Sequence, residues 1–289
     1  MDSSQYSKVA TEMNTAVITV YYNSSGVIGN FLSGLPEWIK TIVVDNASDD
    51  RHAVNNQTRP LHPIALDENV GYGAACNIGA AATDASFLLF ANPDVRFSKG
   101  VIEAFLHAAA DYPQAAFNPL IYSNGSLRLR KWSRLLPGSE LSKGLSPADR
   151  ILPVLSGACI FIRREHFERV GGFDPKIFLF HEDDDLSVRL KQAGIELRLA
   201  ADAVIEHSEG ESSGRSLKSE RIKGEAMGRS LVYVMRKHGV RLDLAVERRK
   251  AMFKLLLPQV LFSGLRRTKL LGFLHGLHEG AANRVGDDS

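Results

Sequence analysis

The chain has 289 residues, of which 44% are hydrophobic and 24% are charged, and its formal net charge is +2 at pH 7. This is ordinary globular composition, with enough chain to bury a substantial core in one large or two small domains. The small net charge argues against a protein that binds polyelectrolytes, so no nucleic-acid partner is expected.

The two cysteines, Cys76 and Cys159, lie far apart in apolar or small-residue surroundings. They form neither a disulfide framework nor a set of zinc ligands, so we expect a reducing, cytoplasmic setting. Residues 1–14 are polar, lack the apolar core of a signal peptide and are expected to be a disordered tail. No uncharged apolar stretch reaches the roughly 18 residues of a membrane-spanning helix.

Strands and helices are predicted to alternate up to about residue 115. Apolar, β-branched runs predict buried strands, and apolar residues at helical spacing predict the helices between them. This alternation predicts an α/β fold of βαβ units, with a mostly parallel sheet and helices on both faces. The predicted strands are 16–23, 41–50, the beginning of 62–82 and 87–97, and the predicted helices are 24–35, the end of 62–82 and 98–112.

The remainder of the chain changes character. Residues 126–150 hold Gly, Pro and Ser among basic residues and are predicted to form a mobile loop. A strand and a short helix are expected within 156–178, strands over 195–207 and helices from residue 217 onward. We therefore expect one domain over residues 15–215 and a helical region over 216–289.

Polar residues follow the predicted strands at Asp45, Asn69 and Asp94. Ligands of such sheets bind beyond the carboxyl ends of the strands, so these positions indicate one site. In "LLFANPDV", Pro93 ends the strand and brings Asp94 to the sheet edge, two residues after Asn92. A carboxylate there suits Mg²⁺ or Mn²⁺, although Asn-Pro-Asp is also ordinary turn chemistry.

The segment "DENVGYGAACNIG" places Gly71 and Gly73 before a predicted helix of small residues. Glycine lets the backbone approach a ligand closely, and a helix N-terminus favours phosphate. The G-x-G-x-x-G spacing of dinucleotide-binding sites is absent. Close packing of the helix on the sheet explains the small residues equally well.

In "FLFHEDDDLSVRL", four consecutive acids begin at Glu182, at the start of a predicted helix. At about 3.6 residues per turn, Asp183 lies above two leucines that should face the core. Asp185 can pair with Arg189 four residues later. An inward-pointing Asp183 is a candidate general base, whereas the alternative is a plain acidic helix start favoured by the macrodipole.

His207 ends a predicted strand, as Asp94 does. Both side chains could therefore reach one metal ion. A lone histidine is otherwise more often structural than a ligand.

The motifs occur in one order over residues 15–215: "ITVYYN", "VVDNASDD", "NVGYGAACNIG", "LFANPDV", "GACIFIRREHFERVGGFD", "FHEDDDLSVRL" and "IEHSEGESSG". Each is unspecific, but the ordered set resembles the family 2 glycosyltransferases, inverting enzymes with a GT-A fold that binds nucleotide-diphospho-sugars. Within that family the chain is most similar to bacterial rhamnosyltransferases that use dTDP-rhamnose. The resemblance implies an inverting transfer of a sugar to a hydroxyl of a glycan acceptor, with Mg²⁺ or Mn²⁺.

The resemblance also implies roles for individual residues. Asp183 would be the catalytic base, and Asp94 and His207 would hold the metal ion bound to the diphosphate. Asn92 replaces the first Asp of the family's Asp-x-Asp motif, as in many rhamnosyltransferase-like sequences. The nucleotide and donor contacts implied are Asp45, Asn69, Gly71, Gly73, Asn77, Asn92, Gly157 and Ala158, and the acceptor contacts proposed with them are Glu182, Arg130 and Trp132.

Ten Lys or Arg residues oppose two acids between Arg236 and Lys269, around the apolar "MFKLLLPQVLFSGL". Pro258 is expected to break the helix there. This pattern suits an interfacial helix on an anionic membrane, at the inner face of the cell membrane. The alternatives are a core-packed helix pair with a solvated basic face, or a homodimer contact. Membrane contact would suit a polyprenyl-diphosphate-linked acceptor, which the rhamnosyltransferases that this chain resembles commonly extend.

Three alternatives remain open. A UDP-sugar could be the donor in place of dTDP-rhamnose. A nucleotidyltransferase shares the sheet and the acidic ligands, but it needs a basic Gly-rich loop after the first strand, and "YYNSSGVIGN" has no Lys or Arg. A non-catalytic nucleotide- or carbohydrate-binding module would have no need of Asp183.

Overall fold

The computed structural model describes residues 14–55, 59–130, 132–136, 150–208 and 216–282. Their contacts divide the chain into two compact units. The first unit comprises Met1–Asp174 with Asp183–Ser213, and the second comprises Pro175–Glu182 with Gly214–Ser289. All of the predicted tail except Asn14, and residues 131 and 137–149 of the predicted loop, lie outside the described residues.

A nine-stranded sheet forms the centre of the first unit, in the order β3-β2-β1-β4-β8-β6-β9-β5, with β7 paired to β6. β3, β2, β1 and β4 run parallel, whereas β8 is antiparallel to both of its neighbours, so the sheet is mixed. The strands are β1 (Thr15–Tyr21), β2 (Lys40–Asp45), β3 (His62–Ala65), β4 (Phe87–Ala91), β5 (Val95–Phe97), β6 (Ala115–Ser123), β7 (Ser126–Arg128), β8 (Cys159–Arg163) and β9 (Glu196–His207).

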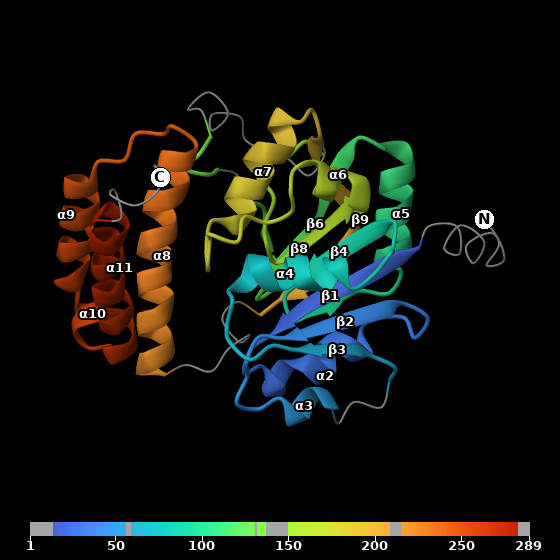
Figure 1. Cartoon of the computed structure of the whole chain (residues 1–289), viewed down its shortest axis with the longest axis horizontal. Coiled ribbons are helices and arrows are strands. Elements are labelled where there is room, and N and C mark those ends of the chain that lie inside the picture. Colours follow the sequence, from blue (N-terminus) through green and yellow to red (C-terminus); the bar gives the residue numbers. More distant parts are fainter. Residues whose placement is uncertain (1–13, 56–58, 131, 137–149, 209–215, 283–289) are drawn as a thin grey trace. The chain divides into compact units, whose positions relative to one another are not determined.

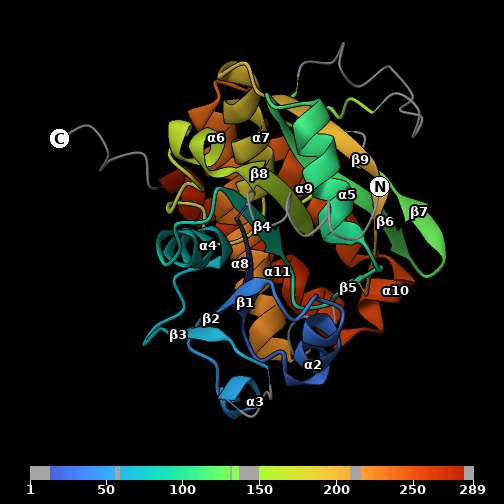
Figure 2. The same cartoon turned by 90° about the vertical axis from the view of Figure 1, so that its right-hand side faces the viewer.

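Helices cover both faces of this sheet, as predicted (Figures 1 and 2). Val17 on β1 belongs to one core, with residues of α2 and α5, and the next residue, Ile18, belongs to a second core, with residues of α4 and α7. The alternation follows from the two-residue repeat of a strand. The helices of this unit are α2 (Ser25–Ser33), α3 (His52–Asn55), α4 (Tyr72–Ala81), α5 (Val101–Asp111), α6 (Arg164–Arg169) and α7 (Glu182–Gln192).

Two strands differ from the sequence-based expectation. The single strand predicted over 87–97 divides at the turn around Pro93, and β5 then joins the far end of the sheet beside β9. β6 was not predicted, and it contains Pro119 at the point where its register with β9 shifts. Proline cannot donate to the ladder, so it normally argues against an interior strand, and the irregularity at Pro119 accommodates it.

The second unit is helical. α8 and α11 lie side by side (Figure 1). Gly224 of α8 contacts Lys269 of α11, and Gly228, further along α8, contacts Phe273, further along α11, so the two helices run parallel. A Cβ at Gly224 would collide with the Lys269 carbonyl, and one at Gly276 with the Glu225 carbonyl, so the close approach requires glycine. The helices are α8 (Leu217–Lys237), α9 (Leu244–Leu255), α10 (Pro258–Leu261) and α11 (Gly264–Ala282).

The predicted break at Pro258 is confirmed, because α9 ends at Leu255 and Pro258 begins α10. Among the residues that the structure describes, no helix is both long enough and apolar enough to cross a membrane.

Candidate active site

The carboxyl end of β2 is tied to the segment before α4 by Asn46, which the sequence analysis did not single out. The Asn46 amide nitrogen donates to Asn69 Oδ1 at 2.9 Å and to the Gly71 carbonyl at 3.3 Å. Its Oδ1 accepts from the Val70 backbone N–H at 2.9 Å. Asn46 is 3% exposed, so these bonds are made away from water. Asn69 and Gly71 are thereby held against the end of β2, beside Asp45.

Asp45 lies buried at this edge of the sheet, beside the side chain of Tyr21. Asp45 Oδ1 accepts from the Ser48 backbone N–H at 2.9 Å, and the Arg51 guanidinium lies 3.4 Å from Oδ2. Tyr21 pairs with Asp45 in the register of β1 and β2, and its hydroxyl donates to the Asp50 carbonyl at 3.1 Å. Burial, followed by the hydrogen bond and charge of Asp50, raises the pKa of Tyr21 far above its ordinary value. Tyr21 therefore remains a neutral hydrogen-bonding group.

The start of α4 carries two of the predicted glycines. Gly71 stands just before the helix with a φ of 88°, which favours glycine, and Gly73 is buried. Further along α4, Asn77 donates to the Phe173 carbonyl at 2.8 Å and accepts from the Phe173 N–H at 2.9 Å. The Asn77 amide therefore braces α4 against the segment after α6.

Asp94 and His207 lie side by side, as predicted from their places at strand ends. β5 and β9 pair with Val95 opposite His207, and this register brings His207 Nε2 to 3.1 Å from Asp94 Oδ1. Asp94 is 4% exposed, and its Oδ2 is buried with no hydrogen-bond partner among the residues that the structure describes. An unsatisfied buried carboxylate oxygen beside an imidazole fits a bound divalent cation.

The described residues supply part of such a coordination shell. Among the described residues, no three His, Cys, Asp or Glu side chains gather as they would around an ion held by protein alone. Phosphate oxygens and water are suitable further ligands for a hard cation held by Asp94 and His207.

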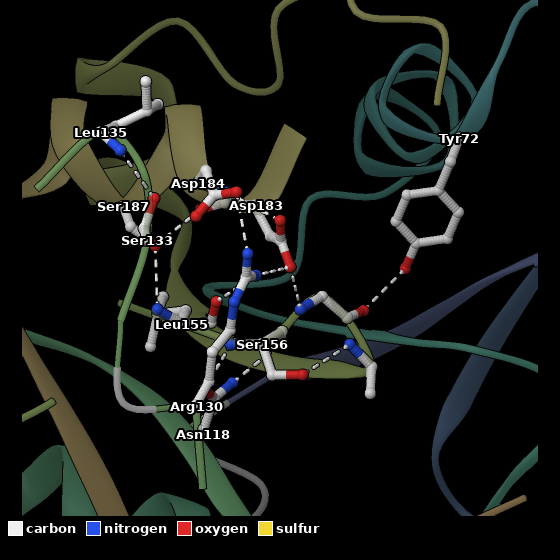
Figure 3. A network of polar contacts seen from close by, with 12 residues as sticks. Tyr72, Asn118, Arg130, Ser133, Leu135, Leu155, Ser156, Asp183, Asp184 and Ser187 are labelled. Atoms are coloured by element: carbon white, nitrogen blue, oxygen red, sulfur yellow. Dashed lines mark hydrogen bonds and ion pairs between the residues drawn. The ribbon is translucent and has the colours of Figure 1, made fainter. Parts of the chain in front are cut away.

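Asp183, in the first turn of α7, points to the loop before β8 (Figure 3). Its Oδ2 accepts from the Gly157 N–H at 2.8 Å, and its Oδ1 accepts from the Asp184 N–H at 2.8 Å. A Cβ at Gly157 would lie 3.1 Å from Asp183 Oδ2, so a larger residue would press on the carboxylate. The structure thus brings two predicted site residues, Gly157 and Asp183, into direct contact.

The loop before β8 connects the parts of the predicted site. The Ala158 carbonyl accepts from the backbone N–H of Asn92 at 3.0 Å, in the same turn that carries the candidate metal ligand. The Gly157 carbonyl accepts from the hydroxyl of Tyr72, the first residue of α4, at 3.3 Å. Together with the bond to Asp183, these contacts place the loop between three segments that the sequence analysis had singled out separately.

Two buried polar side chains fix the shape of this loop (Figure 3). Asn118 of β6 accepts from the Ser156 N–H at 2.6 Å and donates to the Cys159 carbonyl at 2.6 Å. Ser187 of α7 accepts from the Leu155 N–H at 2.9 Å. Neither was predicted, although a lone Asn in the apolar run "AAFNPLIYS" is a signal that could have found Asn118.

Arginines offset the repulsion within the acidic cluster. Arg189 Nε donates to Asp185 Oδ2 at 2.8 Å, which confirms the pair predicted four residues apart on α7. Arg130 bridges the other two aspartates, with Nη1 bonded to Asp183 Oδ2 and Nη2 lying 2.8 Å from Asp184 Oδ2. The three aspartates of the cluster are thus divided between two arginines at one helix start.

The three residues proposed to contact an acceptor lie in different surroundings. Trp132 is 60% exposed, and Glu182 is buried and belongs by its contacts to the second unit. Arg130 is bonded to Asp183, so of the three it contacts the candidate base directly.

Two family models match the chain. One described as "Glycosyl transferase family 2" matches residues 16–171, and one described as "Glycosyltransferase like family 2" matches residues 145–222. The first match covers more than half of the 289 residues. The resemblance noted from the ordered motifs is thereby confirmed.

A curated relative from Mycobacterium tuberculosis is named N-acetylglucosaminyl-diphospho-decaprenol L-rhamnosyltransferase. It is 30% identical to this chain over 237 residues, which cover 69% of this chain and 77% of the relative. The similarity to a rhamnosyltransferase expected from the motifs is thus found in a second, independent comparison.

Solved structures of glycosyltransferases share the fold. The mannosyltransferase PcManGT from Pyrobaculum calidifontis, in complex with GDP-Man and Mn²⁺, matches with a TM-score of 0.58 at 14% identity, covering 97% of this chain and 94% of that one. The S. aureus TarS structure with UDP matches with a TM-score of 0.53 at 17% identity, covering 93% and 92%. At these identities the likeness concerns the fold alone, and it confirms the predicted GT-A fold.

Proposed function

The chain belongs to glycosyltransferase family 2, and we propose that it is an inverting rhamnosyltransferase. It transfers L-rhamnose from dTDP-rhamnose to a hydroxyl of a saccharide carried on a polyprenyl diphosphate. The name of the mycobacterial relative supports both the sugar and the class of acceptor.

One observation carries the catalytic part of this proposal: a single loop holds the candidate base and the candidate metal-binding turn. Gly157 N–H bonds Asp183, and the adjacent Ala158 carbonyl bonds the backbone of Asn92. Groups that act on one bond must lie within a few ångströms of the reacting atoms, and the contacts of both groups with adjacent loop residues support this arrangement.

In the reaction, the oxygen of an acceptor hydroxyl attacks the anomeric carbon of the donor. Asp183 takes the hydroxyl proton as the new C–O bond forms, which contributes roughly 10²–10⁴-fold to the rate. The bond from the anomeric carbon to the diphosphate breaks on the opposite side, and its electron pair leaves with dTDP. The configuration at the anomeric carbon is therefore inverted.

Asp94 and His207 would hold the divalent cation, because Asp94 Oδ2 is buried with no hydrogen-bond partner beside the imidazole. When bound, Mn²⁺ or Mg²⁺ neutralises the negative charge that develops on the departing diphosphate. The Mn²⁺ in the PcManGT structure supports this expectation.

At the other end of the donor, Asp45 accepts a hydrogen bond from the N3–H of thymine. Uracil presents the same N–H, so a UDP-sugar remains the alternative donor, and the UDP in the TarS structure favours keeping it open. The backbone at Asn69 and Gly71, which Asn46 fixes in place, contacts the remainder of the nucleotide.

A screen of nucleotide sugars with the purified protein, read as released nucleoside diphosphate, tests the donor. We expect dTDP-rhamnose to turn over fastest and dTDP to bind more tightly than UDP by calorimetry. Faster turnover of a UDP-sugar would replace the donor assignment. Binding of dTDP without turnover of any donor, in the presence of N-acetylglucosaminyl-diphospho-decaprenol, would instead favour a non-catalytic binding module.

We also propose that the second unit meets the membrane that carries the acceptor. α9 and α10 expose an apolar surface beside exposed basic residues, a combination that suits an anionic bilayer surface. We call this surface the apolar tip, and it consists of Met252, Phe253, Leu256, Leu261 and Phe262, next to Arg249, Lys254, Arg266 and Arg267.

Flotation with phosphatidylcholine vesicles, with and without phosphatidylglycerol, tests the apolar tip. We expect the full chain to float with the anionic vesicles and to be released by salt. Replacing Phe253, Leu256 and Phe262 together by Ser should abolish flotation and leave the folding of the protein intact, because all three are exposed. Unchanged flotation of this variant, or wild-type protein that does not float, would refute membrane contact, and a concentration-dependent dimer lost in the same variant would identify the tip as a homodimer contact.

A further inference from the structure

We propose that Arg130 is a positioning residue for Asp183, and that it directs the acceptor proton to one oxygen of that carboxylate, Oδ1. This inference rests on the proposed role of Asp183 as the base. The sequence placed Arg130 only in a basic loop near an acceptor, and the structure gives its guanidinium a different set of partners.

Arg130 reaches three groups from a segment far from α7 in the sequence (Figure 3). Nη1 bonds Asp183 Oδ2 and also donates to the Leu155 carbonyl at 3.2 Å, while Nη2 lies 2.8 Å from Asp184 Oδ2. A planar guanidinium can hold two carboxylates in one fixed plane, which the single ammonium of a lysine cannot do. The side chain of Arg130 is 30% exposed and that of Asp184 is 3% exposed, so the contact is largely removed from water.

These bonds leave the two oxygens of Asp183 in unequal states. A carboxylate oxygen has two acceptor positions. Oδ2 accepts from Arg130 and from Gly157, whereas Oδ1 accepts only the Asp184 N–H among the hydrogen bonds of the described residues. Oδ1 thus retains an acceptor position for a substrate hydroxyl.

Asp184 explains why an arginine next to the base does not cancel its charge. Two carboxylates and one guanidinium sum to a charge of −1, so Arg130 by itself does not neutralise both aspartates. Asp184 also holds the far side of the guanidinium, so the charge of Arg130 is shared between two carboxylates. Of the three consecutive aspartates, the first meets substrate, the second anchors Arg130 and the third pairs with Arg189.

During transfer, the acceptor oxygen forms the new bond to the anomeric carbon and its proton passes to Asp183 Oδ1. The electron pair of the broken bond leaves with the diphosphate. Arg130 takes no proton, because it already carries its full charge and keeps its bonds to Oδ2 and to Asp184 throughout.

The test compares Arg130→Ala and Arg130→Lys with Arg189→Ala as a matched control, since Arg189 pairs with Asp185 on the same helix. Turnover is followed as dTDP released from dTDP-rhamnose with N-acetylglucosaminyl-diphospho-decaprenol, and donor affinity by calorimetry. We expect Arg130→Ala to lower kcat by about 10- to 100-fold with an unchanged Kd for dTDP, because a misplaced base loses rate rather than binding. Arg130→Lys should fall between Arg130→Ala and the wild type.

Added guanidinium ion at non-denaturing concentration should restore several-fold of the lost kcat in Arg130→Ala. It should have no such effect on Arg189→Ala, which loses thermal stability instead. A wild-type kcat in Arg130→Ala, a parallel loss of dTDP affinity, or an absence of rescue would each overturn the proposal. If Arg130→Ala does not fold, the comparisons of kcat and of the Kd for dTDP apply to Arg130→Lys.

Asp183→Asn separates this inference from the proposed function. If Asp183→Asn turns over normally, the base assignment fails and the role of Arg130 fails with it. If Asp183→Asn is inactive while Arg130→Ala is unaffected, only the inference about Arg130 fails. In the Asp183→Asn background, Arg130→Ala should lower the residual kcat no further, because the residue acts through the base.

Discussion

Two ends of the candidate site differ in how their polar groups are held. At the donor end, which we define as Asn46, Asn69 and Gly71, the buried Asn46 amide is bonded on both its nitrogen and its oxygen. At the transfer end, defined as Asp94, Gly157, Asp183 and His207, Asp94 Oδ2 is buried without a hydrogen-bond partner and Asp183 Oδ1 retains an acceptor position.

The difference indicates a division of work. A saturated, neutral network forms a rigid shape, which suits recognition of a nucleotide. A carboxylate with a free acceptor position can take a proton, as proposed for Asp183, or bind a cation that neutralises a leaving group, as proposed for Asp94. Substitutions at the transfer end should therefore change kcat or metal dependence, and those at the donor end should change stability and nucleotide affinity.

Asp183→Asn should give the largest effect, a fall in kcat of at least about 10²-fold. The amide keeps the size of the side chain but cannot accept a proton from the acceptor. Donor affinity should stay near that of the wild type, because the carboxylate acts on the acceptor hydroxyl. Steady-state kinetics and calorimetry with dTDP check both parts, and near-normal turnover would remove Asp183 from the role of base.

Asp94→Ala should come next, with the affinity for dTDP in the presence of Mn²⁺ weakened about tenfold or more, which is about 1.4 kcal/mol. The affinity measured in chelator should be the same for variant and wild type, because both then lack the cation. Wild-type activity that persists in excess chelator would argue against a required metal.

Asn46→Ala probes the donor end and should act mainly on stability. It leaves the half-buried Val70 N–H and the buried Gly71 carbonyl without this partner, which costs about 1–3 kcal/mol in the free energy of unfolding. Affinity for dTDP should fall with little change in kcat at saturating donor. A large loss of kcat with an unchanged affinity for dTDP would contradict the proposed division between the two ends.

The smallest effect concerns acid sensitivity at the edge of the donor end. Burial acts to raise the pKa of Asp50, but hydrogen bonds from Ser25, Tyr21 and the backbone together outweigh it, and the pKa lies below its ordinary value. Asp50 therefore stabilises the fold above the unfolded pKa of about 4, and this contribution is lost as pH falls through the folded pKa. Asp50→Asn should unfold with less dependence on pH below about 4 in denaturant titrations, and an unchanged dependence would refute the contribution.

The sequence predicts those parts of the molecule that rest on local pattern. The alternation of apolar runs predicts β1 to β4 with their helices, and the i, i+4 spacing predicts the pair Asp185–Arg189. Strand ends also indicate Asp94 and His207, because a carboxyl end of a strand has a definite position at a sheet edge.

The remaining features depend on residues far apart in the chain. Arg130 and Asp183 are separated by 53 positions, and no local pattern announces their contact. Asn46 and Asn118 work by bonding backbone of other segments, which a sequence shows only as polar residues in or beside apolar strands. β6 escapes prediction because Pro119 interrupts its pattern.

The central claim is that Asp94, His207 and Asp183 surround one donor diphosphate. A crystal of the protein grown with Mn²⁺ and dTDP, with the metal located by its anomalous scattering, tests this most directly. The account predicts one Mn²⁺ peak within bonding distance of Asp94, His207 and the dTDP diphosphate, with the terminal phosphate facing Asp183. A metal bound elsewhere, or a diphosphate turned away from α7, would contradict it.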